Sequence, residues 1–140
     1  MSAADPWRAR ARTAEAIALL ALARLLVAAA PFARWRGRLG LAGEAAPEQH
    51  RLARQLAGHV ERGAWRLGLP LKCLPRAMAL SWMLRRRGIA HRLVMAARPQ
   101  SDRGGADEAL HAWVECADET VLGALDGPWL EVFAAPRPRF

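Results

Sequence analysis

Residues 73–88 place the strongest constraint on how this 140-residue chain can fold. Their middle part, residues 77–84, is apolar except for one serine, so a helix formed here has no polar face. Pro75 suits the first turn of such a helix, and Gly88 follows three arginines as a typical helix end. Because a helix that is apolar all round is usually buried, the sequence predicts a central helix that begins at or just after Cys73.

Two more helices are predicted before this one. The first has Asp5 as its N-cap and Pro6 at its first position, and it runs to about residue 30, where Pro31 ends it. Three glycines in residues 37–43 indicate a linker. A second helix follows Pro47, and its apolar side chains recur every three or four residues. They define one buried face: Leu52, Leu56, Val60, Ala64 and Leu67.

After residue 88 the hydrophobic period changes to the alternation of strands. Strands are predicted at residues 91–97, 110–116, 120–125 and 129–133, with a loop at residues 99–107. The order of elements predicts a single α+β domain, with N-terminal helices and a central buried helix packed on a small antiparallel sheet. Its parts are a helical region at residues 1–68, the central helix with the strands at residues 69–133, and a frayed tail at residues 134–140.

The charge of the chain is strongly basic, with a net charge of +8 and Lys72 as its only lysine. The arginines are scattered over the whole length, which gives weak, salt-sensitive attraction to polyanions. Three interpretations follow: a solvated surface, an acidic peptide or protein partner, or a nucleic-acid or membrane surface. No nucleic-acid motif supports the last of these.

Residues 14–33 contain two apolar blocks that Arg24 separates. Each block is shorter than the roughly 20 apolar residues that a membrane span needs, and a central arginine is costly in a bilayer. The segment predicts a soluble helix without a transmembrane span, with a signal peptide or a surface anchor as alternatives.

The two cysteines, Cys73 and Cys116, do not form a disulfide framework, and no His/Cys cluster has zinc spacing. We therefore expect neither a metal nor a cofactor. Free thiols fit a reducing compartment, so the sequence predicts a cytoplasmic protein.

Cys73 and His111 are the residues with the clearest chemical potential. A cysteine at a helix N-terminus has backbone N–H groups beside it that favour the thiolate and stabilise an oxyanion. His111 begins the predicted strand at residues 110–116 and can serve as general base and then general acid. A two-residue turn at residues 118–119 would place Asp126 opposite His111, as the third group that orients the ring.

Simpler interpretations stand beside these roles. A lone cysteine near an apolar helix is usually a small buried hydrophobic residue, and Cys116 fits that description. His50, His59 and His91 lie in polar or basic stretches and are expected to be exposed.

The sequence around both residues resembles the lasso-peptide maturation peptidases, which are small transglutaminase-like relatives of papain-type cysteine peptidases. The resemblance covers about residues 72–125 and rests on two blocks: Cys73-Leu74-Pro75-Arg76-Ala77-Met78-Ala79-Leu80 with residues 84–89, and His111-Ala112-Trp113-Val114-Glu115.

The resemblance implies a cysteine endopeptidase that cuts the leader region from a ribosomal precursor peptide, so that a macrolactam-forming ligase can close the ring. Cys73 would be the nucleophile and His111 the base. The acid of the family follows the histidine strand after a hairpin, where residues 121–124 carry no carboxylate and Asp126 comes slightly later.

The chain resembles the split form of the family, which needs a separate leader-recognition protein. The two N-terminal helices would form a docking face for this partner, with Trp7 and Trp35 as anchors, or they simply cover the sheet.

Two hypotheses compete with a peptidase. One is a catalytically silent papain-like module that holds a peptide for another enzyme, which the missing carboxylate favours. The other is a basic domain that binds nucleic acid or membrane, with a steep salt dependence.

Overall fold

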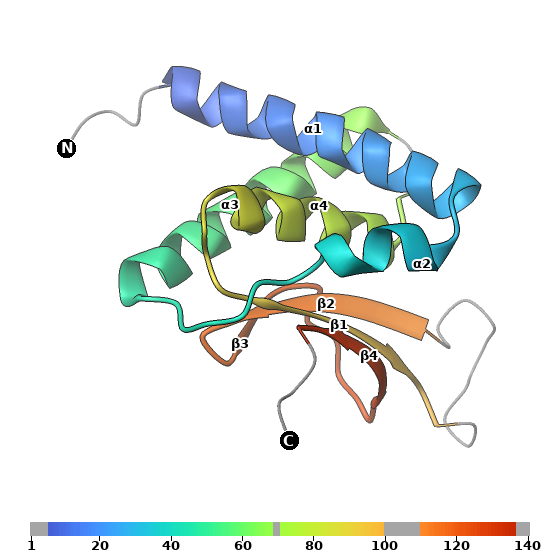
Figure 1. Ribbon diagram of the computed structural model, residues 1–140. Coiled ribbons are helices and arrows are strands. Elements are labelled where there is room, and N and C mark those ends of the chain that lie inside the picture. Colours follow the sequence, from blue (N-terminus) through green and yellow to red (C-terminus); the bar gives the residue numbers. More distant parts are fainter. Residues whose placement is uncertain (1–5, 69–70, 100–109, 137–140) are drawn as a thin grey trace.

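The computed structural model describes residues 6–68, 71–99 and 110–136. A layer of helices covers one face of a four-stranded antiparallel sheet (Figure 1). This arrangement confirms the predicted α+β fold with helices packed on a small sheet. The predictions for Asp5, for the loop at residues 100–107 and for the tail at residues 137–140 lie outside the described residues.

The long helices begin and end close to their predicted bounds. They are α1 (Pro6–Ala29), α3 (Pro47–Leu67) and α4 (Cys73–Arg86). Helix α4 lies between the other two helices and the sheet, and it is the buried central helix that the sequence predicts. Its buried residues are Pro75, Ala77, Met78, Ala79, Leu80, Ser81, Met83 and Leu84.

The glycine-containing segment after α1 is more ordered than predicted. It contains a short helix, α2 (Phe32–Trp35), and a 3-10 turn, η1 (Arg36–Arg38). The Trp35 indole is buried, packs edge-on against Phe32 at a centroid distance of 4.9 Å, and donates its N–H to the Ala30 carbonyl. Trp35 therefore belongs to the core and cannot be the surface anchor that we predicted, whereas Trp7 is 78% exposed.

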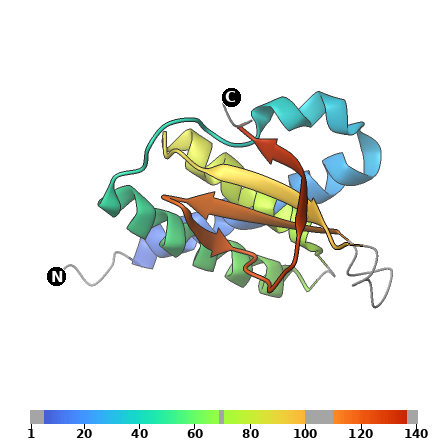
Figure 2. The same cartoon turned by 90° about the horizontal axis from the view of Figure 1, so that it is seen from below.

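The sheet consists of β1 (Arg92–Ala97), β2 (Leu110–Cys116), β3 (Glu119–Leu122) and β4 (Leu130–Ala135), in the spatial order β3-β2-β1-β4. The last strand therefore returns across the sheet to pair with the first, instead of extending a meander (Figure 2). Ala134 and Ala135, predicted to belong to a frayed tail, are buried in β4.

The β2–β3 hairpin turns one residue earlier than predicted. Ala117 and Asp118 both have positive φ, 52° and 63°, as a two-residue hairpin turn requires. Cys116 pairs with Glu119, and after an irregularity Val114 pairs with Leu122. The predicted turn at residues 118–119 is therefore wrong, and the turn and the bulge both change the register in which β2 and β3 pair.

A buried hydrogen-bonded chain ties the linker, α4 and β1 together. The Gly40 N–H donates to Ser81 Oγ at 2.9 Å, and Ser81 Oγ lies 2.7 Å from His91 Nε2. His91 Nδ1 lies 2.8 Å from the carbonyl of Ile89, to which it donates. The prediction that His91 is exposed is wrong: burial lowers the pKa of its imidazole to about 4.

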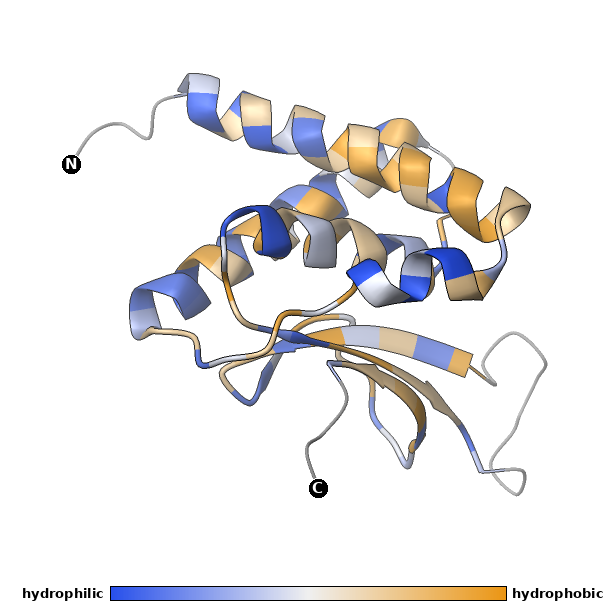
Figure 3. Ribbon diagram, in the orientation of Figure 1, coloured by the Kyte–Doolittle hydropathy of each residue, from blue (hydrophilic) through white to orange (hydrophobic). Residues whose placement is uncertain are grey.

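The first helix changes character along its length, from a basic first half to an apolar second half (Figure 3). Leu20 and Ala23 face the core, whereas Leu22, Leu25 and Val27 are exposed. No helix within residues 6–68, 71–99 and 110–136 is both long and apolar enough to cross a membrane.

Candidate active site

Cys73 is the first residue of α4 and is half-buried. Lys72 precedes it in an extended conformation, and no described side chain caps the helix. The first backbone N–H groups of α4 are therefore left to bind an external acceptor. A thiolate or an oxyanion at this position would gain from these donors and from the helix dipole.

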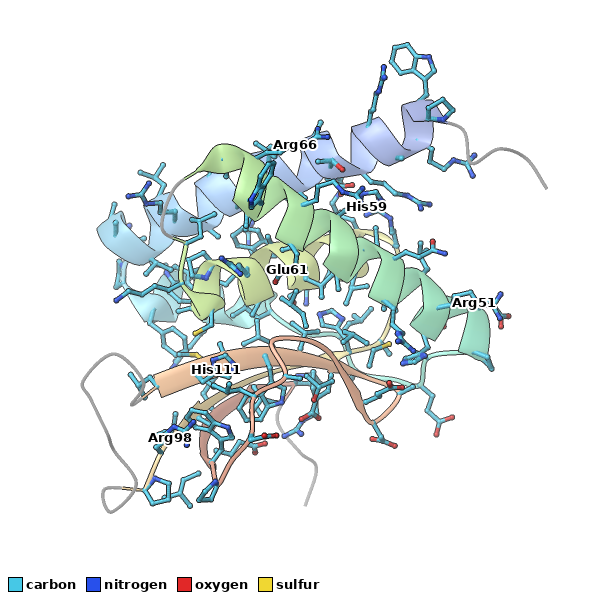
Figure 4. The ribbon with its side chains drawn as sticks, turned by 180° about the vertical axis from the view of Figure 1, so that it is seen from behind. Arg51, His59, Glu61, Arg66, Arg98 and His111 are labelled. Atoms are coloured by element: carbon cyan, nitrogen blue, oxygen red, sulfur yellow. The ribbon has the colours of Figure 1, made fainter. Side chains whose placement is uncertain are left out.

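The start of α4 is fixed to its neighbours by both apolar and charged contacts. Leu71 is buried just before the helix, and Cys73 and Leu74 pack against the hydrophobic core. Arg76 donates to Glu61 of α3 at 2.9 Å, and Glu61 points from α3 toward α4 (Figure 4). The first turn thus has a defined place although its N–H groups have no cap.

His111 lies near the start of β2 (Figure 4), and its side chain shares a face of the sheet with Trp113, whereas Ala112 and Val114 face the helices. Its Nε2 lies 2.6 Å from the carbonyl oxygen of Gly123. A carbonyl oxygen can only accept a hydrogen bond, so Nε2 carries the proton and donates it. In the neutral ring, Nδ1 is then the nitrogen with a free lone pair.

Two tryptophans surround the His111 ring. Trp129 stacks on it with centroids 5.4 Å apart, and Trp113 lies 6.1 Å away. The Trp129 N–H donates to the Leu125 carbonyl, and the guanidinium of Arg98 covers the Trp129 ring at 4.4 Å. A pocket of about 440 Å³ borders both tryptophans and also contains the Glu115 and Asp126 side chains.

The elements that carry the two residues are in contact, because α4 packs on β2. The N-terminal end of α4 and the first residues of β2 also lie toward the same end of the molecule in both views (Figures 1 and 2). Within the described residues, however, no hydrogen bond joins Cys73 to His111. Contact between the two side chains stays a prediction.

Asp126 is exposed in the segment between β3 and β4. Its backbone carbonyl accepts a bond from Arg98 at 3.4 Å, and no hydrogen bond in the described part of the chain joins its carboxylate to His111. The role of Asp126 as third group stays a prediction.

The second cysteine has a different environment. Cys116 is 1% exposed, and its thiol donates to the Ala90 carbonyl at 3.5 Å. Burial raises the pKa of this thiol. Among the described side chains, no group of three His, Cys, Asp or Glu could hold a metal ion.

The larger pocket of the molecule, about 1050 Å³, lies at the opposite end of the β1–β2 pair. It is lined by His91, Arg92 and Asp118 among others, and neither Cys73 nor His111 borders it. By size alone this pocket would be the candidate site. The N-terminus of α4 at Cys73 and the imidazole of His111 lie outside it.

Sequence reasoning missed two residues that contact the His111 ring. Gly123 was considered as part of a stretch without a carboxylate, although a glycine after a strand often marks close approach of two backbones. Trp129 was assigned only to a strand. Its position after a Gly-Pro turn gives no signal that it would stack on His111.

Comparison with known proteins gives one match. A family profile described as transglutaminase-like superfamily matches residues 16–131. No curated protein and no solved structure matches the chain significantly.

Proposed function

Because this chain belongs to the transglutaminase-like superfamily, we propose that it is a cysteine endopeptidase that removes the leader peptide from a ribosomally made lasso-peptide precursor. Members of the superfamily generally have cysteine peptidase or transglutaminase activity. The observation that carries the proposal is a helix that begins at Cys73 and packs on β2, the strand of His111. Among the described residues, no side chain caps this helix and His111 Nδ1 has no hydrogen-bond partner.

The proposed reaction uses both residues and balances its protons. The Cys73 thiol gives its proton to His111 Nδ1, and the sulfur attacks the carbonyl carbon of the scissile peptide bond. The N–H groups of the first turn of α4 receive the negative charge on the carbonyl oxygen. His111 then protonates the leaving amine, and water activated by the same ring hydrolyses the thioester.

The choice of peptidase over transferase rests on the resemblance of the Cys73 and His111 blocks to the lasso-peptide peptidases. A separate leader-recognition protein would bring the precursor. The exposed side chains Leu22, Leu25 and Val27 on α1 support a docking role for this helix, together with exposed Trp7. Asp126 is the carboxylate that the sequence proposes beside His111.

The test is incubation of the precursor peptide with this protein and the candidate leader-recognition protein, read by mass spectrometry. We expect one cleavage event, at the junction of leader and core. Cys73→Ala and His111→Ala should each abolish it, with rates lower by about 10³-fold or more. Cys116→Ala is the matched control and should keep the rate. Cleavage at an unchanged rate by Cys73→Ala would refute the proposal.

A catalytically silent peptide-binding module is the second candidate. It is favoured by the absence of a bond between Cys73 and His111 among the described residues and by the exposed position of Asp126. A silent module would still bind the precursor but would show no cleavage with any partner. In a strain that lacks the gene, the Cys73→Ala variant of a silent module would restore function as well as the unchanged protein.

A further inference from the structure

We propose that the backbone carbonyl of Gly123 is the positioning group of the His111 imidazole, in the role for which a carboxylate was expected. This inference rests on the proposed function, because it concerns how the same imidazole works. Its geometry, however, can be tested without any cleavage.

The hydrogen bond itself sets the chemistry of the ring. The Nε2-to-oxygen distance of 2.6 Å is short for a bond between N–H and a carbonyl, whose usual distance is about 2.9 Å. Since the carbonyl cannot donate, it holds the proton on Nε2 in both charge states of the ring. Nδ1 is therefore the nitrogen that can accept a proton from a thiol, which is what a general base beside Cys73 requires.

Glycine at position 123 is what brings the carbonyl to the ring. Strand β3 ends at Leu122, and Gly123 has φ +83°, a conformation that residues with side chains rarely adopt. A Cβ at this position would lie 2.9 Å from the Ala112 carbonyl oxygen and 3.2 Å from Trp113 Cβ. The chain therefore approaches β2 more closely than any other residue would allow.

In the described part of the chain, the carboxylates near the ring have other partners or lie in solvent. Glu115 accepts from the Trp113 N–H at 2.7 Å and pairs with Arg92 at 3.2 Å. Asp126 is exposed in the segment beyond Gly123. Among the described residues, the Gly123 carbonyl is the acceptor that bonds the His111 ring.

The aromatic cover lies over one face of the part-buried imidazole. Trp129 stacks on the imidazole with the ring planes 27° apart, and it is fixed in turn by the Leu125 carbonyl and by Arg98. A hydrogen bond shielded from solvent is stronger and more directional than an exposed one. The bond and the stack together fix both the tilt and the rotation of the ring.

The tautomer is the first test. We would record the ¹⁵N chemical shifts of His111 in the Cys73→Ala protein, without substrate, at a pH where imidazoles are neutral. We expect the proton on Nε2, with Nδ1 unprotonated. A proton on Nδ1 would overturn the inference and would leave the proposed function standing.

The second test compares two variants in the cleavage assay. Gly123→Ala should lower kcat by about 10²-fold and shift the His111 tautomer ratio, because the carbonyl must move. Asp126→Asn should lower kcat less than Gly123→Ala does. Gly88→Ala is the matched control, since Gly88 has φ +67° but open space around its Cβ position.

The outcomes separate the two proposals. A loss in Asp126→Asn as large as that in Gly123→Ala would restore the carboxylate and overturn the inference. If Gly123→Ala does not fold, the tautomer of the unchanged ring decides. An Nε2 proton in a protein that never cleaves would support the positioning geometry and contradict the peptidase.

Discussion

A cysteine and a histidine lie toward each end of the β1–β2 pair. At one end, which we call closed, their polar atoms are hydrogen-bonded; at the other, which we call open, a ring nitrogen and a thiol have no partner among the described residues. At the closed end, the Cys116 thiol donates to the carbonyl of Ala90, the residue before His91, and both His91 and Cys116 are buried. Both nitrogens of His91 are occupied, by Ser81 and by the Ile89 carbonyl. At the open end, His111 uses one nitrogen and Cys73 is half-buried at an uncapped helix start.

This difference teaches that residue types alone do not define a reactive pair. A saturated imidazole and a thiol bonded to a buried carbonyl stabilise the core, because each polar group is satisfied where water is absent. An imidazole with a free Nδ1 can accept a proton. Changes at the closed end should therefore affect stability, and changes at the open end should affect reactivity.

The largest effect is expected from Gly40→Ala, which breaks the closed end. Gly40 has φ +77°, and an added Cβ would overlap the backbone carbonyl of Ala135 in β4. Because backbone cannot move aside cheaply, we expect the free energy of unfolding to fall by about 4 kcal/mol or more. Urea unfolding measures it. Gly68→Ala, with φ +64° and open space, is the control and should cost about 1 kcal/mol.

The second-largest effect is expected from acid, which should lower the free energy of unfolding by protonating His91 at the closed end. The folded pKa of His91 is about 4, below the ordinary value of 6.5, so the unfolded chain binds the extra proton first. The contribution is complete above pH 6.5 and is lost as the pH falls toward about 4, for a total of about 3 kcal/mol. Urea unfolding between pH 4 and 7 measures it. If His91→Gln shows the same slope, another group is responsible.

The two thiols should differ in reactivity. Burial raises the pKa of the Cys116 thiol and covers it, whereas Cys73 is partly accessible beside free N–H groups. We expect iodoacetamide to alkylate Cys73 at least about tenfold faster than Cys116 at neutral pH. Mass spectrometry of tryptic peptides gives both rates in one sample. Equal rates in the native protein would remove the contrast between the two ends.

The smallest effect is expected from Glu61→Gln at the open end. The Glu61–Arg76 pair is solvent-accessible, with side chains 49% and 36% exposed. Such pairs contribute about 0.2–1 kcal/mol, so we expect a change in unfolding free energy below 1 kcal/mol. Thermal unfolding measures it. A larger loss would mean that charge, and not apolar packing, fixes the start of α4.

Much of the helical layer could be predicted from the sequence because its signals are local. Pro6, Pro47 and Pro75 mark helix starts, and the apolar run at residues 77–84 leaves no solvent face for α4. The alternation that predicted β2 at residues 110–116 is equally local, and the observed bounds agree.

The remainder depends on contacts between distant residues, which local patterns do not encode. His91 looks exposed because Arg92 follows it and three arginines precede it, and only the approach of Gly40 and Ser81 makes it a core residue. The pairing of β4 with β1 likewise joins segments that are far apart in the sequence. At the candidate site, Cys73 and His111 stood out by residue type and position, but a backbone carbonyl carries no side-chain signature, so Gly123 did not.

The return of β4 to the edge beside β1 has a consequence for biosynthesis. Of the four strands, residues 130–135 leave the ribosome last, yet their backbone packs against Gly40, which was translated long before. The helices can form as they emerge, whereas the sheet cannot be completed until translation has passed Ala135. A nascent chain halted before that point would carry its thiol without a finished scaffold around it.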